Sequence, residues 1–162
     1  MHDDDASQLS DPEARNFVLY LGRARKAYFA ALDDVPAEAF LWQPPAEDMN
    51  SLSVICTHAV ASAEWWVLGC AGNGSLDRDR DVEFSAHESW DVLRDRFEAW
   101  QRAASELVNG MSRTDLDRVS RHPAGDVSVR QCLAHTIEHL NLHRGHVEIT
   151  LNWWKSWSDD RQ

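Results

Sequence analysis

Four histidines lie close together near the end of the chain, within the run HTIEHLNLHRGH: His135, His139, His143 and His146. Their spacings of four, four and three residues return to the same side of an α-helix. At about 100° per residue, with His135 at zero, the other three rings fall within roughly 80° of it. Polar residues cluster on the far side of the same wheel, between roughly 180° and 300°. The pattern therefore predicts that all four imidazole rings point inward.

An inward row of imidazoles needs partners, because a buried polar ring without one costs about 1–3 kcal/mol. Carbonyls, hydroxyls or water in the core can satisfy one ring, but here they would have to satisfy four adjacent rings. A divalent metal satisfies several rings at once, and histidines four residues apart on a helix can both reach one ion. We therefore expect a metal site on this helix, with hydrogen-bonded core histidines as the alternative.

A fifth histidine, His58, lies on the apolar stripe of an earlier helical pattern and is also expected to face the core. Two ligands from one helix and one from a neighbour leave coordination positions open, which is typical of catalytic metal sites. The central pair His139 and His143 is the natural choice to join His58. His135 and His146 then lie one turn to either side, suited to proton transfer or to hydrogen bonding with the ligands.

Four helical patterns account for most of the sequence. The first begins after Asp11 and ends before Pro36, and the second runs from about 51 until the glycine-containing stretch 69–75. The third follows a capping box of Ser85 and Glu88 and ends at 109–110. The fourth follows a second capping box at 128–131 and runs to about 154.

These helices, without a convincing strand pattern, predict an all-α four-helix bundle. We expect one domain over 1–162, with an ordered core of about 11–155 and loose acidic ends. The connections at about 34–50, 71–85 and 110–128 are long for a simple up-and-down bundle. They permit a crossover and could shape the mouth of a pocket. On the fourth helix, apolar residues beside the histidines (Leu142, Ile149 and Trp153) and on a flank (Leu133, Leu140, Val147 and Leu151) predict a broad buried face.

The formal net charge of −11 disfavours nucleic acid and anionic membranes as partners, since both require clustered Lys and Arg. The start of the chain lacks the apolar stretch of a signal peptide, and no run approaches the ~18 apolar residues of a membrane span. Three cysteines without a CxxC pair fit a reducing compartment. We therefore expect a cytoplasmic protein.

Several other residues have simpler expected roles. The eight tryptophans are expected mainly in the core, with an aromatic pocket or a subunit interface as the alternative. Cys132 and His135 could pair as nucleophile and base, but nothing in the sequence positions a third group to orient them. Glu64 is expected to form an interhelical hydrogen bond or ion pair, and His87 and His122 are expected to be ordinary surface residues.

The chain resembles the DinB-like superfamily of bacterial four-helix bundles over roughly residues 12–155. The resemblance rests on four stretches: WQP at 42–44, SLSVICTH at 51–58, EWW at 64–66 and HLNLHRGH at 139–146. One histidine on the second helix together with HxxxH-R-G on the fourth is specific as a combination. The glutamine usual after the Arg-Gly pair is His146 here, and some relatives have an acidic residue in place of His139.

The resemblance implies a divalent metal, zinc or nickel, with iron or manganese as further choices, held by three histidines. Carried over residue by residue, these are His58, His139 and His143. It also implies a homodimer and, as in some members, metal-assisted transfer involving a low-molecular-weight bacterial thiol such as mycothiol or bacillithiol.

Three functions follow as hypotheses. The first is a thiol S-transferase that acts on a small-molecule substrate, in which His135 or His146 takes the thiol proton. The second is a metal-dependent hydrolase, in which the same centre acidifies water toward a pKa of ~7. The third is a bundle without chemistry, either metal-binding and stress-related or merely hydrogen-bonded through its histidines.

Overall fold

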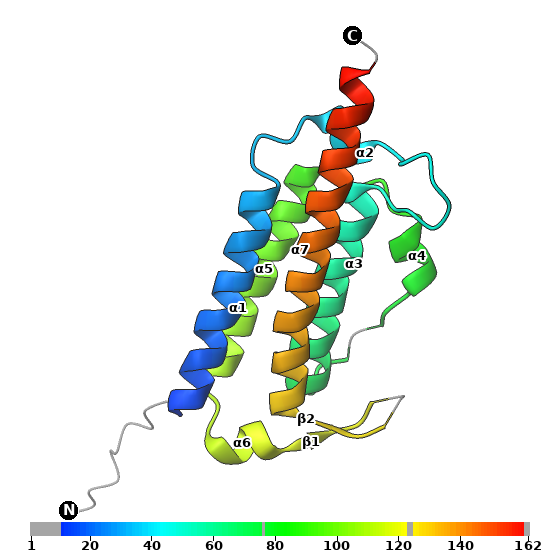
Figure 1. Cartoon of the computed structure of the whole chain (residues 1–162). Helices are drawn as coiled ribbons and strands as arrows, with labels where there is room; N and C mark the ends of the chain where they lie inside the picture. Colours follow the sequence, from blue (N-terminus) through cyan, green and yellow to red (C-terminus); the bar gives the residue numbers. More distant parts are fainter. Residues whose placement is uncertain (1–10, 76, 123–124, 161–162) are drawn as a thin grey trace, which may run out of the picture.

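Four long helices lie side by side in the computed structural model, which describes residues 11–75, 77–122 and 125–160 (Figure 1). They are α1 (Pro12–Ala31), α3 (Leu52–Glu64), α5 (Trp90–Asn109) and α7 (Val129–Asp159), and α3 continues as the π-helical η1 (Trp65–Ala71). The connections contain α2 (Ala37–Leu41), α4 (Arg80–Phe84), α6 (Arg113–Asp117) and the strands β1 (Val119–Ser120) and β2 (Val127–Ser128). The predicted all-α four-helix bundle is confirmed.

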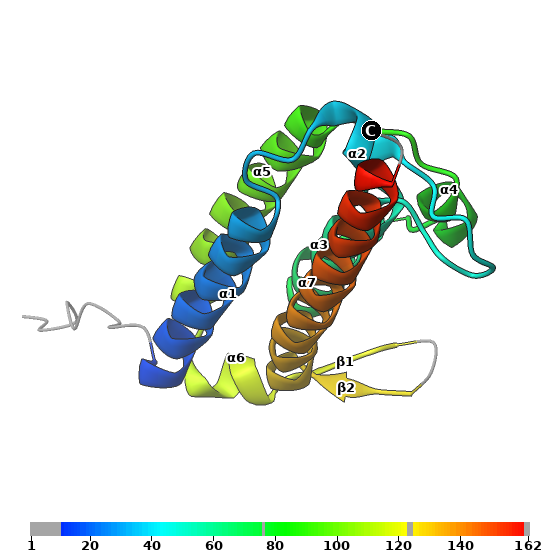
Figure 2. The ribbon, with the colours of Figure 1, turned by 45° about the horizontal axis from the view of Figure 1, so that its top comes forward.

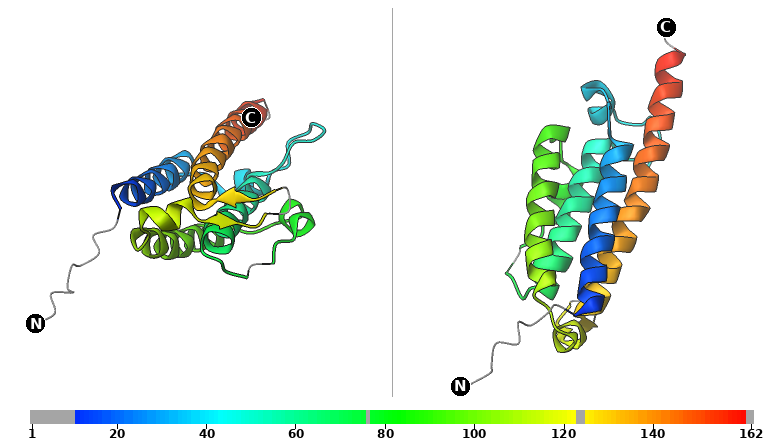
Figure 3. Two further views of the ribbon diagram at one scale, coloured as in Figure 1. Left: turned by 90° about the horizontal axis from the view of Figure 1, so that it is seen from below. Right: turned by 90° about the vertical axis from the view of Figure 1, so that its left-hand side faces the viewer.

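The bundle contains a crossover. Helices α1 and α7 run in one direction, and α3 and α5 run in the opposite direction (Figure 1). Figure 2 separates α1 and α5 from α3 and α7, and each of the four helices packs on two others. The connection from η1 to α5 must therefore return along the length of the bundle. It carries α4, which lies outside the bundle against α3 (Figure 3).

Helix α3 is the most deeply buried element, with every residue from Leu52 to Ala63 inside the fold. Its alanines, serines and cysteine are small enough for neighbouring helices to pack closely on all sides. Together with η1, this stretch is long and apolar enough to cross a membrane, with a mean hydropathy of 1.3. The expectation that no run approaches a membrane span was therefore wrong by length and composition. Burial explains the apolarity, because 78% of the most apolar part lies inside the bundle.

Aromatic rings fill one end of the core. Tyr28 lies 5.3 Å from Phe97, and Phe29 contacts both Phe97 and Trp90 edge-on, at 5.9 and 5.1 Å between ring centroids. Trp100 is fully buried beside them along α5. All eight tryptophans lie in the described part of the chain, and of these Trp153 is exposed and the other six are half-buried, so the expectation that they lie mainly in the core was wrong. These contacts fix α1 against α5 and leave the opposite side of the bundle, between α3 and α7, for polar residues.

Two helix ends differ from the expected ones. Ser89, not Ser85, caps the start of α5, because residues 80–84 form a separate helix and Ser85 closes it. Helix α7 continues past 154 to Asp159, so of the ends expected to be loose, 158–159 are helical. Residues 1–10 and 161–162 lie outside the described part of the chain. The two-residue strands β1 and β2, paired antiparallel, are too short to produce a visible alternation in the sequence.

The histidine row lies at the edge of the buried face of α7, not at its centre. On the wheel used above, the buried residues centre near roughly 110°, whereas the histidines span roughly 0–80°. Leu142, Ile149 and Trp153 fall on the outer side of the row and are 55%, 53% and 45% exposed, so the prediction that they are buried was wrong. The homodimer stays a prediction.

The capping box of Ser128 and Gln131 is present at the start of α7, as expected. The Ser128 hydroxyl accepts from the Gln131 amide at 3.2 Å, and the Gln131 side chain accepts from the Ser128 amide at 2.7 Å. We expect Ser128→Ala to lower the free energy of unfolding by about 1 kcal/mol, measured by chemical denaturation. The control Ser156→Ala removes an exposed hydroxyl within the last turns of the same helix and should change it by less than about 0.5 kcal/mol. Equal effects would contradict the capping role.

Candidate metal centre

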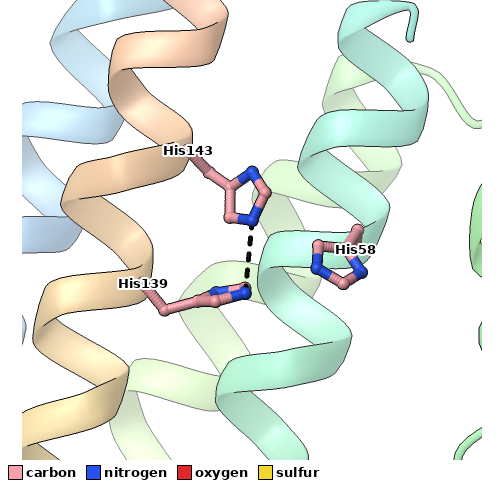
Figure 4. Close-up of side chains that lie close together, drawn as sticks. All are labelled: His58, His139 and His143. Atoms are coloured by element: carbon pink, nitrogen blue, oxygen red, sulfur yellow. Dashed lines mark hydrogen bonds between the residues drawn. The ribbon is translucent and has the colours of Figure 1, made fainter. Parts of the chain in front are cut away.

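Three histidines from two helices meet between α3 and α7. His58 comes from α3, and His139 and His143 come from consecutive turns of α7 (Figure 4). Each ring offers one nitrogen, and these three nitrogens lie within 4.8 Å of one another. The ring of His58 lies 5.1 Å from that of His139 and 4.9 Å from that of His143, between centroids. The three rings thus form a compact group that could hold one metal ion.

The spacing of the nitrogens fits a single ion. The Nε2 atoms of His139 and His143 are 3.2 Å apart. Two imidazole nitrogens bound at 2.0–2.1 Å to one tetrahedral ion are separated by about 3.3 Å. Three nitrogen ligands suit zinc, nickel, copper or iron and do not suit the oxygen-seeking calcium and magnesium ions. The donor set and the spacing therefore both fit a transition metal.

A buried carboxylate orients His58. Glu83, on α4, is 4% exposed, and its Oε2 lies 2.8 Å from Nδ1 of His58. Because a carboxylate only accepts hydrogen bonds, Nδ1 carries the hydrogen, and Nε2 keeps the lone pair that a metal requires. Arg78 holds the same carboxylate through two hydrogen bonds, at 2.6 Å to Oε1 and 3.0 Å to Oε2. A carboxylate behind a histidine ligand is the usual outer shell of a metal site.

The electrostatics keep the rings neutral and the carboxylate charged. Burial lowers the pKa of His139 to about 3 and that of His143 to about 4, with further lowering from the neighbouring histidines. Burial also lowers the pKa of His58, although Glu83 opposes the shift. Burial would raise the pKa of Glu83, but the hydrogen bonds from Arg78 and His58 outweigh it and lower that pKa. Neutral imidazoles are the form that binds metals.

The two outer histidines of the row occupy different surroundings. His146 is exposed, and its Nδ1 lies 3.2 Å from Nδ1 of His143, which leaves Nε2 of His143 to face His139. His135 is half-buried, packs on Trp66 at 4.4 Å and lies 5.5 Å from the ring of His139. The inward orientation predicted for the whole row therefore holds for three rings and was wrong for His146.

A pocket of about 770 Å³ opens in front of the histidines, and His58, His135 and His139 form part of its wall. Trp65 and Trp66 face it from η1, the π-helical continuation of α3. A π-helical turn changes the direction of its side chains relative to an α-helix, and such turns recur at functional sites. The turn ends at Gly72 and Gly74, where a Cβ atom would lie 2.6 Å from the carbonyl oxygen of Leu68.

The hairpin after α6 completes the pocket. His122 stacks on Trp66 at 4.7 Å with an angle of 13° between the rings, and it also contacts Trp65 edge-on. The expectation that His122 is an ordinary surface residue was therefore wrong. The hairpin is formed by two-residue strands without a sequence signature, so nothing in the sequence placed His122 beside the pocket. His87 is exposed, as expected.

Glu83 and Arg78 were also missed by sequence reasoning. Both lie in a connection that carries no periodic pattern, and their partner His58 is at least 20 residues away. The one available signal was a pair of opposite charges five residues apart, which is too common to indicate a site. The ion pair expected for Glu64 is confirmed, because its carboxylate accepts two hydrogen bonds from Arg96 of α5.

The cysteines cannot supply a nucleophile at this site. Cys132 is fully buried, and burial raises the pKa of its thiol to about 11. Cys56 does not line the pocket, and its sulfur accepts a hydrogen bond from the Tyr28 hydroxyl at 3.6 Å. Burial raises the pKa of the Cys56 thiol to about 12. This burial agrees with the expectation that Cys132 and His135 do not act as nucleophile and base.

Comparison with known proteins supports the fold. The sequence profile of the DinB superfamily matches residues 20–147, which include all three clustered histidines. A solved structure described as the conserved protein of a locus from Enterococcus faecalis superposes with a TM-score of 0.66 and 12% sequence identity. The superposition covers 86% of this chain and 95% of that one. With a sequence identity of 12%, the similarity supports the fold alone. No curated protein matches the chain at a significant level.

We expect metal affinity to depend on the three histidines and on Glu83. Purified protein should bind one transition-metal ion per chain, and His58→Ala and His143→Ala should abolish this binding. Glu83→Gln should weaken it by about 10–100-fold, because the charged carboxylate that accepts from His58 is replaced by a neutral amide that can also turn its NH₂ group toward the ring. The measurement is elemental analysis together with titration against a competing chelator. The matched control Glu64→Gln also breaks a carboxylate–arginine pair but leaves the histidines untouched, and should bind like the wild type. Equal losses in both variants would contradict the role of Glu83.

The stability of the metal-free protein should fall in acid because of the histidine cluster. The folded-state pKa values of about 3 and 4 lie below the value of about 6.5 in the unfolded chain. As pH falls below about 6.5, the unfolded state therefore binds protons that the folded state refuses, and the free energy of unfolding decreases. Chemical denaturation at pH 7.5 and pH 5 should give a smaller decrease for the double variant His139→Gln, His143→Gln than for wild type. His87→Gln, outside the cluster, should keep the full decrease. If the double variant loses as much free energy of unfolding between pH 7.5 and pH 5 as the wild type, the histidine cluster is not the cause of the acid destabilisation.

Proposed function

Because this chain belongs to the DinB superfamily and three of its histidines bring their nitrogens together beside a pocket that His58 and His139 line, we propose that it is a metal-dependent enzyme acting on a small molecule. The observation that carries the proposal is the histidine group itself, with the Nδ1–H of His58 held by Glu83. Structural zinc sites fill all four coordination positions with protein ligands, whereas three ligands beside a pocket leave one position for a substrate. His58, His139 and His143 would hold the ion, with zinc or nickel as the proposed metal.

The proposed reaction is transfer of a small thiol to an electrophilic carbon. A divalent ion in this position lowers the pKa of a coordinating thiol and so supplies a thiolate near neutral pH. None of the chain's own cysteines can do this, because Cys56 and Cys132 are buried with raised pKa values and Cys70 faces a different pocket. The thiol must therefore come from the substrate. In the transfer, its sulfur bonds to the electrophilic carbon as the leaving group departs with the bonding electrons.

The chain's own residues bind, orient and move protons. Glu83 and Arg78 fix the ring of His58, and His146 fixes that of His143 by the contact between their Nδ1 atoms. His135 lines the pocket and lies next to His139, so it is the base that we propose to take the thiol proton. The indoles of Trp65 and Trp66 exclude water from one side of the pocket and favour a thiolate over competing hydroxide.

Hydrolysis is the alternative proposal for the same centre, since water can occupy the position of the thiol. Glu83, the carboxylate in contact with His58, is already bound by His58 and Arg78 and so does not activate water. Asp77 also lines the pocket, but it is exposed and shared with a neighbouring hollow. For this reason we favour thiol transfer over hydrolysis.

A thiol panel tests the proposal. Metal-loaded protein is mixed with 1-chloro-2,4-dinitrobenzene and with bacillithiol, mycothiol, glutathione or cysteine, and the thioether product is followed by absorbance. We expect conjugation with at least one thiol that a chelator abolishes, that returns on adding metal, and that His143→Ala lacks. His135→Gln should retain the metal but lose about 10²-fold or more in rate. Chelator-sensitive ester hydrolysis without conjugation would favour the hydrolase, and bound metal with neither activity would contradict an enzymatic role.

A further inference from the structure

One side of the pocket in front of the histidines is an aromatic wall. We use this name for Trp65, Trp66, His122 and His135, which all line the pocket. The ring of Trp66 stacks almost in parallel on that of His122 and also packs on that of His135. The ring of Trp65 contacts Trp66 and His122 edge-on. Such a wall favours a flat or apolar group, since rings pack face to face or edge to face at these separations.

The same pocket carries a positive charge that lacks an opposite partner. Arg78 lines it too, but its charge is matched by Glu83. Arg80 forms no ion pair with any residue in the described parts of the chain, and its guanidinium rests near the ring of Phe84, 5.9 Å from the centroid.

One acidic residue, Asp77, also lines the pocket, but it is shared with a neighbouring hollow of about 280 Å³. That hollow contains Arg78 and Arg96 and does not include Arg80. Arg80 is therefore a cation of the histidine pocket that is not shared with the neighbouring hollow, and among the described residues it forms no ion pair with Asp77.

We propose that this pocket selects a small carboxylate-bearing molecule, whose carboxylate pairs with Arg80 and whose flat or apolar part packs on the aromatic wall. A carboxylate is the matching group because its two oxygens fit the guanidinium fork. The volume of about 770 Å³ accommodates such a molecule beside the histidines. The inference rests on the proposed function for its role, since it names the class of substrate that the metal centre receives.

Benzoate and benzamide test the pairing, because they share size and shape and differ in charge. Binding of each is measured by titration calorimetry and by ligand-observed NMR, on zinc-loaded and on metal-free protein. We expect wild type to bind benzoate about tenfold more tightly than benzamide. Arg80→Gln should reduce this ratio to about twofold or less, and Arg80→Lys should keep part of it. The control Arg102→Gln makes the same change of charge on the exposed side of α5, and should leave the ratio unchanged.

The aromatic wall has its own readout. Trp66→Leu should weaken benzoate and benzamide binding by the same factor, about threefold to tenfold, because both lose the same ring contact. Arg80→Gln should weaken only benzoate. This difference separates loss of a contact from general damage to the pocket, and thermal denaturation of each variant checks that the fold is intact.

Each result decides the proposal. A preference for benzoate that Arg80→Gln removes supports the proposed anion site. If the protein shows this preference but fails to bind zinc, the metal-dependent function is contradicted and the anion site is still supported. Equal binding of both probes, binding of neither, or a preference that survives Arg80→Gln would overturn the anion site. A preference for benzoate that is seen only with zinc and that Arg80→Gln leaves unchanged would show that the carboxylate binds the metal, and it would also overturn the anion site.

Discussion

The hydrogen bond between His58 and Glu83 is the interaction on which the candidate site depends. A carboxylate that is 4% exposed is costly to bury unless it is paired. Here one side of Glu83 is held by Arg78 and the other by the imidazole of His58. Glu83 therefore stays charged, His58 stays neutral, and its Nε2 keeps the lone pair that faces the pocket. Removing Glu83 would leave Arg78 without its ion-pair partner and the Nδ1–H of His58 without its acceptor.

The topology of the bundle makes this contact possible. Because α3 and α5 run in the same direction, the chain between them must return along the outside of the bundle. The returning segment passes α3 at the level of His58 and delivers Arg78 and Glu83 there. An up-and-down bundle with short turns would leave the outer side of His58 open to solvent. The long connection is thus part of the site rather than a spacer.

The sequence predicted the scaffold better than the pocket. Helix period, capping residues and glycines carried enough information for the four long helices and for the meeting of His58 with the pair on α7. Local patterns could not fix the rotation of α7, because apolar residues lie on both sides of the histidine row and only packing decides which side is buried. Contacts such as Glu83 with His58 or His122 with Trp66 join aperiodic segments to helices far along the chain. No local rule reports such pairs.

Helix α4 has only five residues and packs mainly on α3, so it adds little to the hydrophobic core. Segments with few buried apolar contacts open at a small fraction of the free energy of global unfolding. Opening of α4 would release Glu83 and Arg78 while the four long helices stay folded. The amide hydrogens of α4 should therefore exchange with solvent far sooner than those of α3. The bond between Glu83 and His58 can accordingly break and form again on a timescale separate from the lifetime of the bundle.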